Sequence, residues 1–147
     1  MAKKYVDRQE MDFVHFSANT EHIQQIYILP SRTSVAVAEE LGNHSSQIIR
    51  IYNIKKPDEP TNIKIFPDTE RNGVVSDIAF SISEPKFMCC LLSEPANRLI
   101  YIDTHKNKSL AESNFALKDL EKITISPTNS HLICATGHTT LKLFKIE

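Results

Sequence analysis

Residues 123–137 read ITISPTNSHLICATG, which is two short apolar runs separated by a polar turn. The same pattern occurs at residues 78–92 (IAFSISEPKFMCCLL) and at residues 26–40 (IYILPSRTSVAVAEE). In each copy the second apolar run begins nine positions after the first, at Val35, Phe87 and Leu132. Short apolar runs bounded by Pro, Ser and Gly are typical of β-strands. The three copies therefore predict a repeated β-hairpin.

A third apolar run follows each hairpin, at residues 48–54, 99–103 and 141–146, and the first copy has a fourth at residues 62–66. The copies recur after 52 and 45 positions, and ~40–45 residues is the length of a four-stranded propeller blade. The fold class that we predict is all-β, a partial WD-type β-propeller of about three four-stranded antiparallel blades.

The third unit ends after three strands, whereas closed propellers have about 4–8 blades. We expect an N-terminal arm at residues 1–10 and an incomplete propeller at residues 11–147. Its blade units are residues 22–67, 74–118 and 120–147, and residues 11–16 are a candidate outer strand of a neighbouring blade. The rest of the propeller would come from a longer chain, of which this is a piece, or from a partner.

Two local features have more than one interpretation. Residues 109–122 have helical propensity, but the repeat requires a fourth strand near residues 110–117, and we predict the strand. The hairpin at residues 136–139 contains Gly137, a residue that can adopt a positive φ.

Composition narrows the classes of function. The net charge is −1 and the pI is about 6.6, so no bulk positive field favours nucleic acid. No apolar stretch is long enough to span a bilayer, and the N-terminus does not resemble a secretory signal. We therefore predict neither nucleic acid nor membrane as a partner, and a reducing compartment for the three cysteines.

The third unit resembles a WD repeat, with Phe144 where that family has its Trp, and Tyr52-Asn53 or Ile102-Asp103 at that place in the other units. No unit has the Trp-Asp pair. The run of Cys134, Gly137, Leu141, Lys142, Leu143 and Phe144 is similar to one in the N-terminal propeller of the cilia- and flagella-associated WD-repeat proteins. This resemblance extends from about His22 to Ile146. It implies a non-catalytic scaffold of the axoneme, associated with inner dynein arms and their regulators.

No pattern in the chain predicts catalysis, a metal site or a cofactor. Cys89, Cys90 and Cys134 lie in strands and are expected in the core, and no Cys-x-x-Cys or His-Glu-x-x-His motif occurs. The candidate partner contacts are basic residues in turns, with ordinary solvent-exposed charge as the alternative interpretation. They are His44 and His138 in equivalent hairpins, and Lys55, Lys56, Lys106 and Lys108 after successive third strands.

The sequence thus predicts an axonemal scaffold located in the cytoplasm, the cytoskeleton and the cilium or flagellum, with axonemal, dynein-associated or tubulin partners. One alternative is a WD-repeat adaptor of a vesicle coat, a ubiquitin ligase or RNA-processing machinery. A propeller hydrolase is a third hypothesis, which would require a convergent set of acidic or His residues.

Overall fold

The computed structural model describes residues 22–41, 46–65, 73–93, 97–115 and 119–147, which form eleven strands and no helix. The first sheet contains β1 (His22–Ile28), β2 (Ser34–Leu41), β3 (Ser46–Asn53) and β4 (Lys56–Lys64). The second contains β5 (Val75–Phe80), β6 (Phe87–Leu92), β7 (Arg98–Asp103) and β8 (Lys108–Asn114). The third contains β9 (Leu120–Ile125), β10 (Leu132–Gly137) and β11 (Leu141–Lys145). Since none of the described residues is helical, no helix there could cross a membrane.

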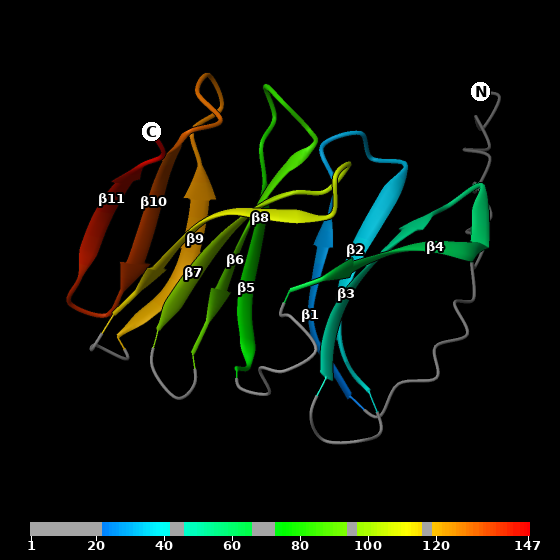
Figure 1. The fold of residues 1–147 in the computed structure, drawn as a ribbon, viewed down its shortest axis with the longest axis horizontal. Helices are drawn as coiled ribbons and strands as arrows, with labels where there is room; N and C mark the ends of the chain where they lie inside the picture. The colour runs from blue at the N-terminus through cyan, green and yellow to red at the C-terminus, as the bar shows by residue number, and fades with distance from the viewer. Residues whose placement is uncertain (1–21, 42–45, 66–72, 94–96, 116–118) are drawn as a thin grey trace, which may run out of the picture.

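Each sheet is an antiparallel meander, and the three sheets stand side by side as blades 1, 2 and 3 (Figure 1). The first strands β1, β5 and β9 are neighbours along one side of the stack. The prediction of about three antiparallel blades, with an incomplete last blade, is confirmed. Residues 108–114 form β8, which pairs with β7 throughout, so the strand interpretation of this segment is correct. The candidate strand at residues 11–16, the arm at residues 1–10 and residues 116–118 lie outside the described residues.

The first hairpin is one residue shorter than its two counterparts, which corrects the sequence alignment. The closing hydrogen bond joins Leu29 to Ser34 in blade 1, but Ser81 to Phe87 in blade 2 and Ser126 to Leu132 in blade 3. Val35 is therefore equivalent to Met88 and not to Phe87. In strands, a shift of one residue moves a side chain to the other face of the sheet. This is why Ala36 and Ala38, and not Val35, pack against blade 2.

Two apolar cores lie between the blades, and blade 2 contributes to both. Met88, Cys90 and Leu92 of β6 pack against blade 1, while Phe87, Cys89 and Leu91 pack against blade 3. Every side chain of β6 is buried, as expected for a strand covered on both faces. The neighbouring Cys89 and Cys90 point to opposite faces because side chains alternate along a strand. The expectation that these two thiols belong to the core is confirmed.

Cys134 is equivalent to Cys89 but is only partly buried, because it lies on the face of blade 3 that points away from blade 2. Burial raises the pKa of Cys89 well above its ordinary value, with a further contribution from Cys90, and burial also raises the pKa of Cys90. We therefore expect a maleimide dye at neutral pH to label one thiol per native chain, Cys134, and all three in denaturant. Mass spectrometry of the labelled peptides measures this. Rapid native labelling of Cys89 or Cys90 would contradict the packing of β6.

Gly137 is needed for a close approach of two backbones, and not for the positive φ that a glycine in a hairpin can adopt. It ends β10 with ordinary strand geometry, and Gly73 is the one glycine with a positive φ in the described part of the chain. A Cβ atom on Gly137 would lie 1.6 Å from the carbonyl oxygen of Asp119. That oxygen belongs to the backbone and cannot rotate away.

Gly137→Ala should therefore destabilise the fold by about 2–3 kcal/mol, the scale of overpacking in a close-packed region. Urea unfolding would measure the free energy, with Thr136→Ala as the matched control on the same strand. We expect the control to lose far less stability. Equal stability of Gly137→Ala and the wild type would show that the two backbones are farther apart.

Candidate interaction surface

The antiparallel topology places the turns of the blades on two opposite rims. One rim, the upper rim in Figure 1, carries five turns: β1–β2, β3–β4, β5–β6, β7–β8 and β9–β10. The β6–β7 and β10–β11 turns lie on the other, the lower rim. Turns are the usual recognition elements on a β scaffold, because they tolerate sequence change without affecting the core.

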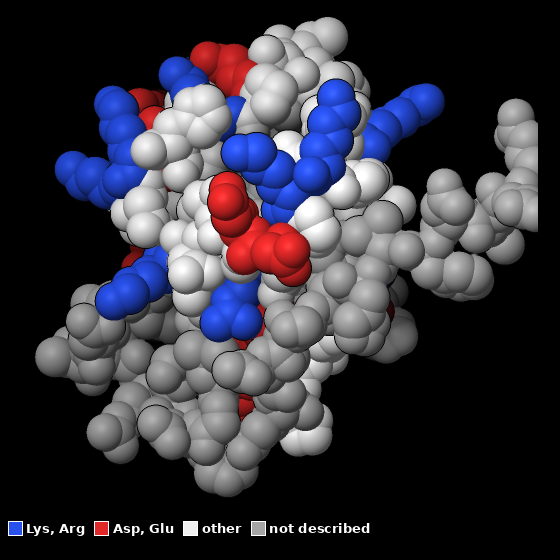
Figure 2. Space-filling view, turned by 90° about the vertical axis from the view of Figure 1, so that its right-hand side faces the viewer, with Lys and Arg blue, Asp and Glu red and all other residues white. Residues whose placement is uncertain are grey.

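The four candidate lysines lie on the upper rim and are exposed. Lys55 is in the β3–β4 turn and Lys106 is in the β7–β8 turn, while Lys56 and Lys108 are the first residues of β4 and β8. Figure 2 shows the side of the molecule that carries β4, where lysine and arginine side chains surround a small group of carboxylates. The ion pair of Lys56 with Glu59, at 3.6 Å, is exposed on both sides, so it contributes little and leaves the lysine available for a partner.

His138 lies on the lower rim, so the structure does not bring it together with the lysines. Its Nε2 atom is 2.9 Å from Oε1 of Glu121, and both side chains are largely exposed. His44, its counterpart in the first unit, lies outside the described residues. Contact of these residues with a partner remains a prediction.

The β7–β8 turn is held in a defined shape and tied to blade 1. Oδ1 of Asp103 accepts the backbone N–H groups of His105 and Lys106, both at 3.0 Å. Asn107 has a φ of 50°, which lies in the left-handed region that Asn tolerates. Its side chain accepts a hydrogen bond from the N–H of Lys64 and donates one to the carbonyl of Asn62. The turn therefore presents its lysines from a fixed position beside β4.

A second set of contacts joins the upper rims of blades 2 and 3. The hydroxyl of Tyr101 donates to the carbonyl of Ser130 at 2.9 Å, and Oγ of Ser130 donates to the carboxylate of Glu84. The ring of Tyr101 stacks on Phe87, with 5.4 Å between centroids. Burial raises the pKa of Tyr101 to about 12, and the hydrogen bond to Ser130 opposes this.

The raised pKa of Tyr101 predicts a loss of stability at alkaline pH. In the unfolded chain the phenol ionises near its ordinary pKa of 10.0, whereas the folded chain retains the proton until about 12. The stabilisation is complete below pH 10 and is lost as the pH rises towards 12, because only the unfolded chain releases a proton in that interval. Unfolding by urea at a series of pH values should show a shallower decline for Tyr101→Phe than for the wild type. Parallel profiles for the two proteins would contradict this assignment.

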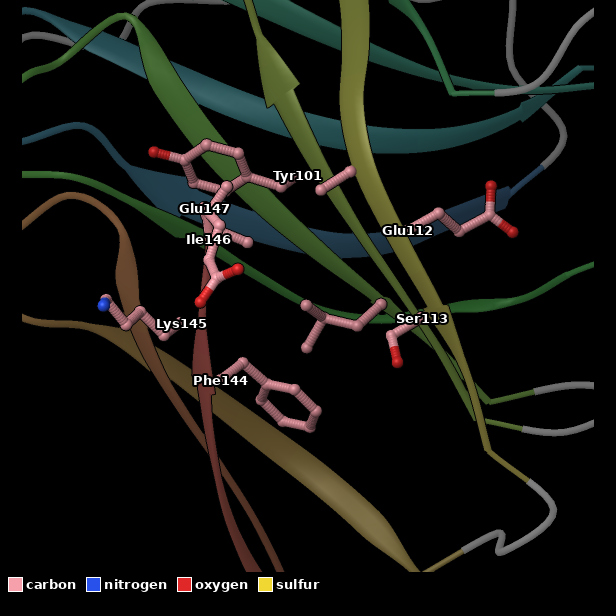
Figure 3. Close-up of a pocket in the computed structure, with 9 residues that line it drawn as sticks. Tyr101, Glu112, Ser113, Phe144, Lys145, Ile146 and Glu147 are labelled. Carbon is pink, nitrogen blue, oxygen red and sulfur yellow. The ribbon is translucent and has the colours of Figure 1, made fainter.

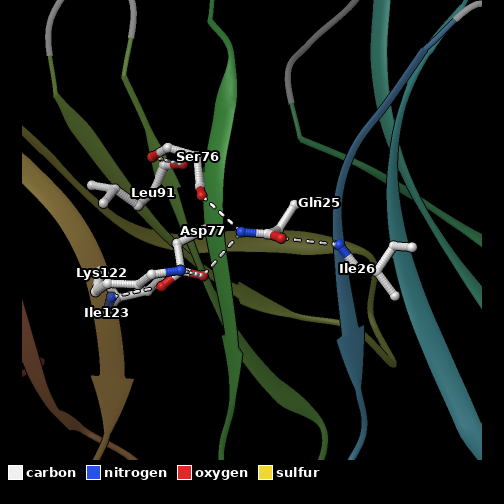
Figure 4. A network of polar contacts seen from close by, with 7 residues as sticks. All are labelled: Gln25, Ile26, Ser76, Asp77, Leu91, Lys122 and Ile123. Carbon is white, nitrogen blue, oxygen red and sulfur yellow. Dashed lines mark hydrogen bonds and ion pairs between the residues drawn. The ribbon is translucent and has the colours of Figure 1, made fainter.

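A polar network on the first strands connects all three blades (Figure 4). Asp77 accepts the N–H of Ile123 from blade 3 at 2.8 Å and the Nε2 group of Gln25 from blade 1 at 3.3 Å. Gln25 also donates to the carbonyl of Ser76 at 2.9 Å. Lys122 lies 3.8 Å from Asp77. Both carboxylate oxygens are thus engaged, which gives Asp77 a structural role in joining the blades.

Asn97 performs a similar function at the lower rim, where its side chain is buried. It accepts the N–H of Leu120 at 3.0 Å and donates to the carbonyls of Leu120 and Leu92. The repeat pattern did not predict a role for Asn97 or Asp77. In the sequence, each of these two residues is only a polar residue beside an apolar run. That pattern does not show which residue of another blade it binds.

A pocket of about 380 Å³ lies between the outer strands of blade 2 and the last strand of blade 3 (Figure 3). Leu99 and Tyr101 of β7, Ala111 and Ser113 of β8, and Phe144 of β11 are among its lining residues. The volume is within the usual range for ligand pockets. No motif predicted it, because it depends on which strands are neighbours. Across the described part of the chain, no three His, Cys, Asp or Glu side chains gather in a way that could hold a metal ion.

These features define a partial β-propeller: three blades, cores between the blades and turns on two rims. No protein-family model matches the chain, and no curated protein matches it either. Solved structures agree with the fold. The β-propeller domain of Cps50 (Swd1) from Myceliophteria thermophila has a TM-score of 0.67 and 13% sequence identity, over 85% of this chain and 36% of that one. Hydrazine synthase from Kuenenia stuttgartiensis has a TM-score of 0.70 and 10% identity, over 87% of this chain and 46% of that one. The chain thus spans less than half the length of either structure.

Proposed function

We propose that this chain is a non-catalytic scaffold that binds other proteins through its upper rim. The observation that carries the proposal is the β7–β8 turn, whose lysines are exposed while its backbone is held by Asp103 and Asn107. A turn fixed in this way loses little conformational freedom when a partner binds. The lysines would attract an acidic protein surface and accelerate association with it.

The side chains that could otherwise take part in catalysis have structural roles within the fold. The thiols of Cys89 and Cys90 are buried in the core, and the Tyr101 hydroxyl donates to a backbone carbonyl. Asp77 accepts hydrogen bonds from blades 1 and 3. Their roles in packing favour recognition over catalysis.

The ciliary or flagellar axoneme is the location that we propose, with inner dynein arms, their regulators or tubulin as the acidic partners. Residues 134–144 support this location, because the run of Cys134, Gly137 and Phe144 resembles one in the propeller of the cilia- and flagella-associated WD-repeat proteins. The exposed lysines suit the acidic surfaces of such filaments.

An antibody against this chain tests the proposal on the endogenous protein of motile cells. Detergent extraction separates axonemes from soluble and membrane proteins, and immunoblotting measures where the protein remains. We expect it to stay with axonemes in detergent and to leave them as salt is raised, because salt screens contacts of exposed lysines. Recovery in the detergent-soluble fraction would contradict the axonemal assignment and favour an adaptor of another assembly.

Variants test the rim itself. Replacement of Lys55, Lys56, Lys106 and Lys108 by Glu should release an epitope-tagged chain from axonemes. Replacement of the same four lysines by Arg keeps their charge, so this control variant should remain bound. Equal retention of both variants would exclude the lysines as the contact.

A further inference from the structure

The β1–β2 turn contains a backbone conformation that its residue does not favour. Arg32 has a φ of 58°, in the left-handed region where the Cβ atom of an L-residue crowds the following carbonyl oxygen. Gly or Asn is the usual residue at such a position in a short hairpin. The N–H of Leu29 donates to Ser34, and the N–H of Arg32 donates to Leu29. The turn therefore has an arginine at a place that glycine would occupy with less strain.

The side chain of Arg32 does not contribute to the part of the fold that the structure describes. Asn107, the other non-glycine residue with a positive φ there, uses its side chain to hold Lys64 and Asn62. The guanidinium of Arg32 is exposed and makes no hydrogen bond or ion pair with the described residues. Because no internal contact compensates for the strained backbone, the side chain is a candidate for binding.

The β3–β4 turn lies beside Arg32 on the upper rim of blade 1 (Figure 1). The N–H of Ile54 donates to the carbonyl of Thr33 at 2.9 Å, which joins the two turns. Ile54 is 44% exposed. Lys55 is also exposed, and Oδ1 of Asn53 accepts its N–H at 2.9 Å. The two turns together present a guanidinium, an ammonium group and an apolar side chain from fixed backbones.

Charge and shape specify the chemistry of the occupant. Residues 29–34 and 53–56, which form the two turns, contain no Asp or Glu. A guanidinium is a planar fork that binds a carboxylate through two parallel hydrogen bonds, whereas an ammonium group acts as a point charge. The surface therefore suits a segment with carboxylates on both sides of an apolar side chain.

We propose that Arg32, Ile54 and Lys55 bind an acidic segment of a partner protein in which an apolar residue lies between carboxylates. Arg32 binds one carboxylate through its fork, Lys55 attracts a second, and Ile54 packs against the apolar residue between them. This deepens the proposed scaffold function, on which it rests. It adds Arg32 as the contact that selects a carboxylate and positions the partner at blade 1.

The test uses the full chain and a fluorescein-labelled peptide with the sequence Gly-Glu-Glu-Leu-Glu-Glu-Gly, and fluorescence anisotropy measures binding. Arg32→Gly should weaken binding about fivefold, the upper end for one exposed ion pair. It should also raise the midpoint of urea unfolding, because glycine adopts a positive φ without strain. Arg32→Asn should have both effects, since Asn tolerates this conformation. An arginine with only a structural role would instead lose stability when replaced.

Three controls separate the fork, the charge and the apolar contact. Arg32→Lys keeps the charge but not the fork, so it should weaken binding about twofold and leave stability unchanged. Lys145→Gln removes an exposed lysine from blade 3 and should bind like the wild type, which excludes an effect of net charge alone. A peptide with Ser in place of Leu should bind more weakly, because it cannot pack against Ile54.

Equal binding by Arg32→Gly and the wild type, or no binding by the wild type, would overturn the proposal. A lower urea midpoint for Arg32→Gly would also overturn it, because Arg32 would then stabilise the turn. Binding of a phosphoserine peptide but not of the glutamate peptide would make phosphate the ligand and reject the carboxylate. If Arg32→Gly stays with axonemes while the lysine-to-glutamate variant leaves them, the scaffold function stands and the role of Arg32 fails, so the two failures are distinguishable.

Discussion

Tyr101→Ala is expected to lower the free energy of unfolding by about 4 kcal/mol, the usual cost of removing a large buried aromatic side chain. Tyr101 is completely buried between blades 2 and 3. The change removes its stacking on Phe87 and its hydrogen bond to the carbonyl of Ser130. Since domains are stable by only about 5–15 kcal/mol, this loss is a large part of the total.

Tyr101→Phe separates the two contributions, because it keeps the ring and removes the hydroxyl. We expect it to cost about 1 kcal/mol, the net contribution of one hydrogen bond. Urea unfolding followed by circular dichroism measures both variants. A cost for Tyr101→Ala no larger than that for Tyr101→Phe would show that the ring does not fill the space between the blades.

Asp77→Ala is the second variant with a large expected effect, about 3 kcal/mol. It leaves the buried N–H of Ile123 without its 2.8 Å partner, and hydrogen bonds to charged groups contribute about 1.5–3 kcal/mol each. It also removes the acceptor for Gln25 of blade 1. Because Asp77 contacts both neighbouring blades, the unfolding transition should also broaden as the blades become less tightly coupled.

Asp77→Asn is the matched control, since its amide oxygen can still accept from Ile123. We expect it to lose about 1 kcal/mol, because a neutral acceptor is weaker than a carboxylate. Urea unfolding compares the two variants by free energy and by the slope of the transition. Similar, small losses for both would mean that Asp77 does not join the blades.

The blade pattern could be predicted from the sequence because it depends on local periodicity. The apolar runs at residues 78–92 predicted a hairpin, and the structure forms β5 and β6 there. The repeat outweighed helix propensity at β8, which is a strand. The alignment of the first hairpin was wrong by one residue, since apolar positions alone do not reveal a shorter turn at residues 29–34.

Contacts between blades could not be predicted, because they join residues that are far apart in the sequence. Asp77 and Ile123 are 46 positions apart, and Tyr101 and Ser130 are 29. Gly137 was singled out as a turn residue, although its function is to admit the backbone of Asp119. The pocket beside β11 depends on Ser113 taking the place that Ile63 has in blade 1. That comparison requires the register of both sheets.

Residue-resolved amide hydrogen exchange by NMR tests most directly whether the three blades form one stack, in which the described strands leave the outer edge of β11 unpaired. We expect the slowest exchange in β6, at the centre of the stack, and an alternating pattern in β11. Lys142 and Phe144 should be protected, whereas Leu143 and Lys145 should exchange rapidly. Protection of Leu143 and Lys145 to the same degree as their neighbours, or rapid exchange throughout β6, would contradict it.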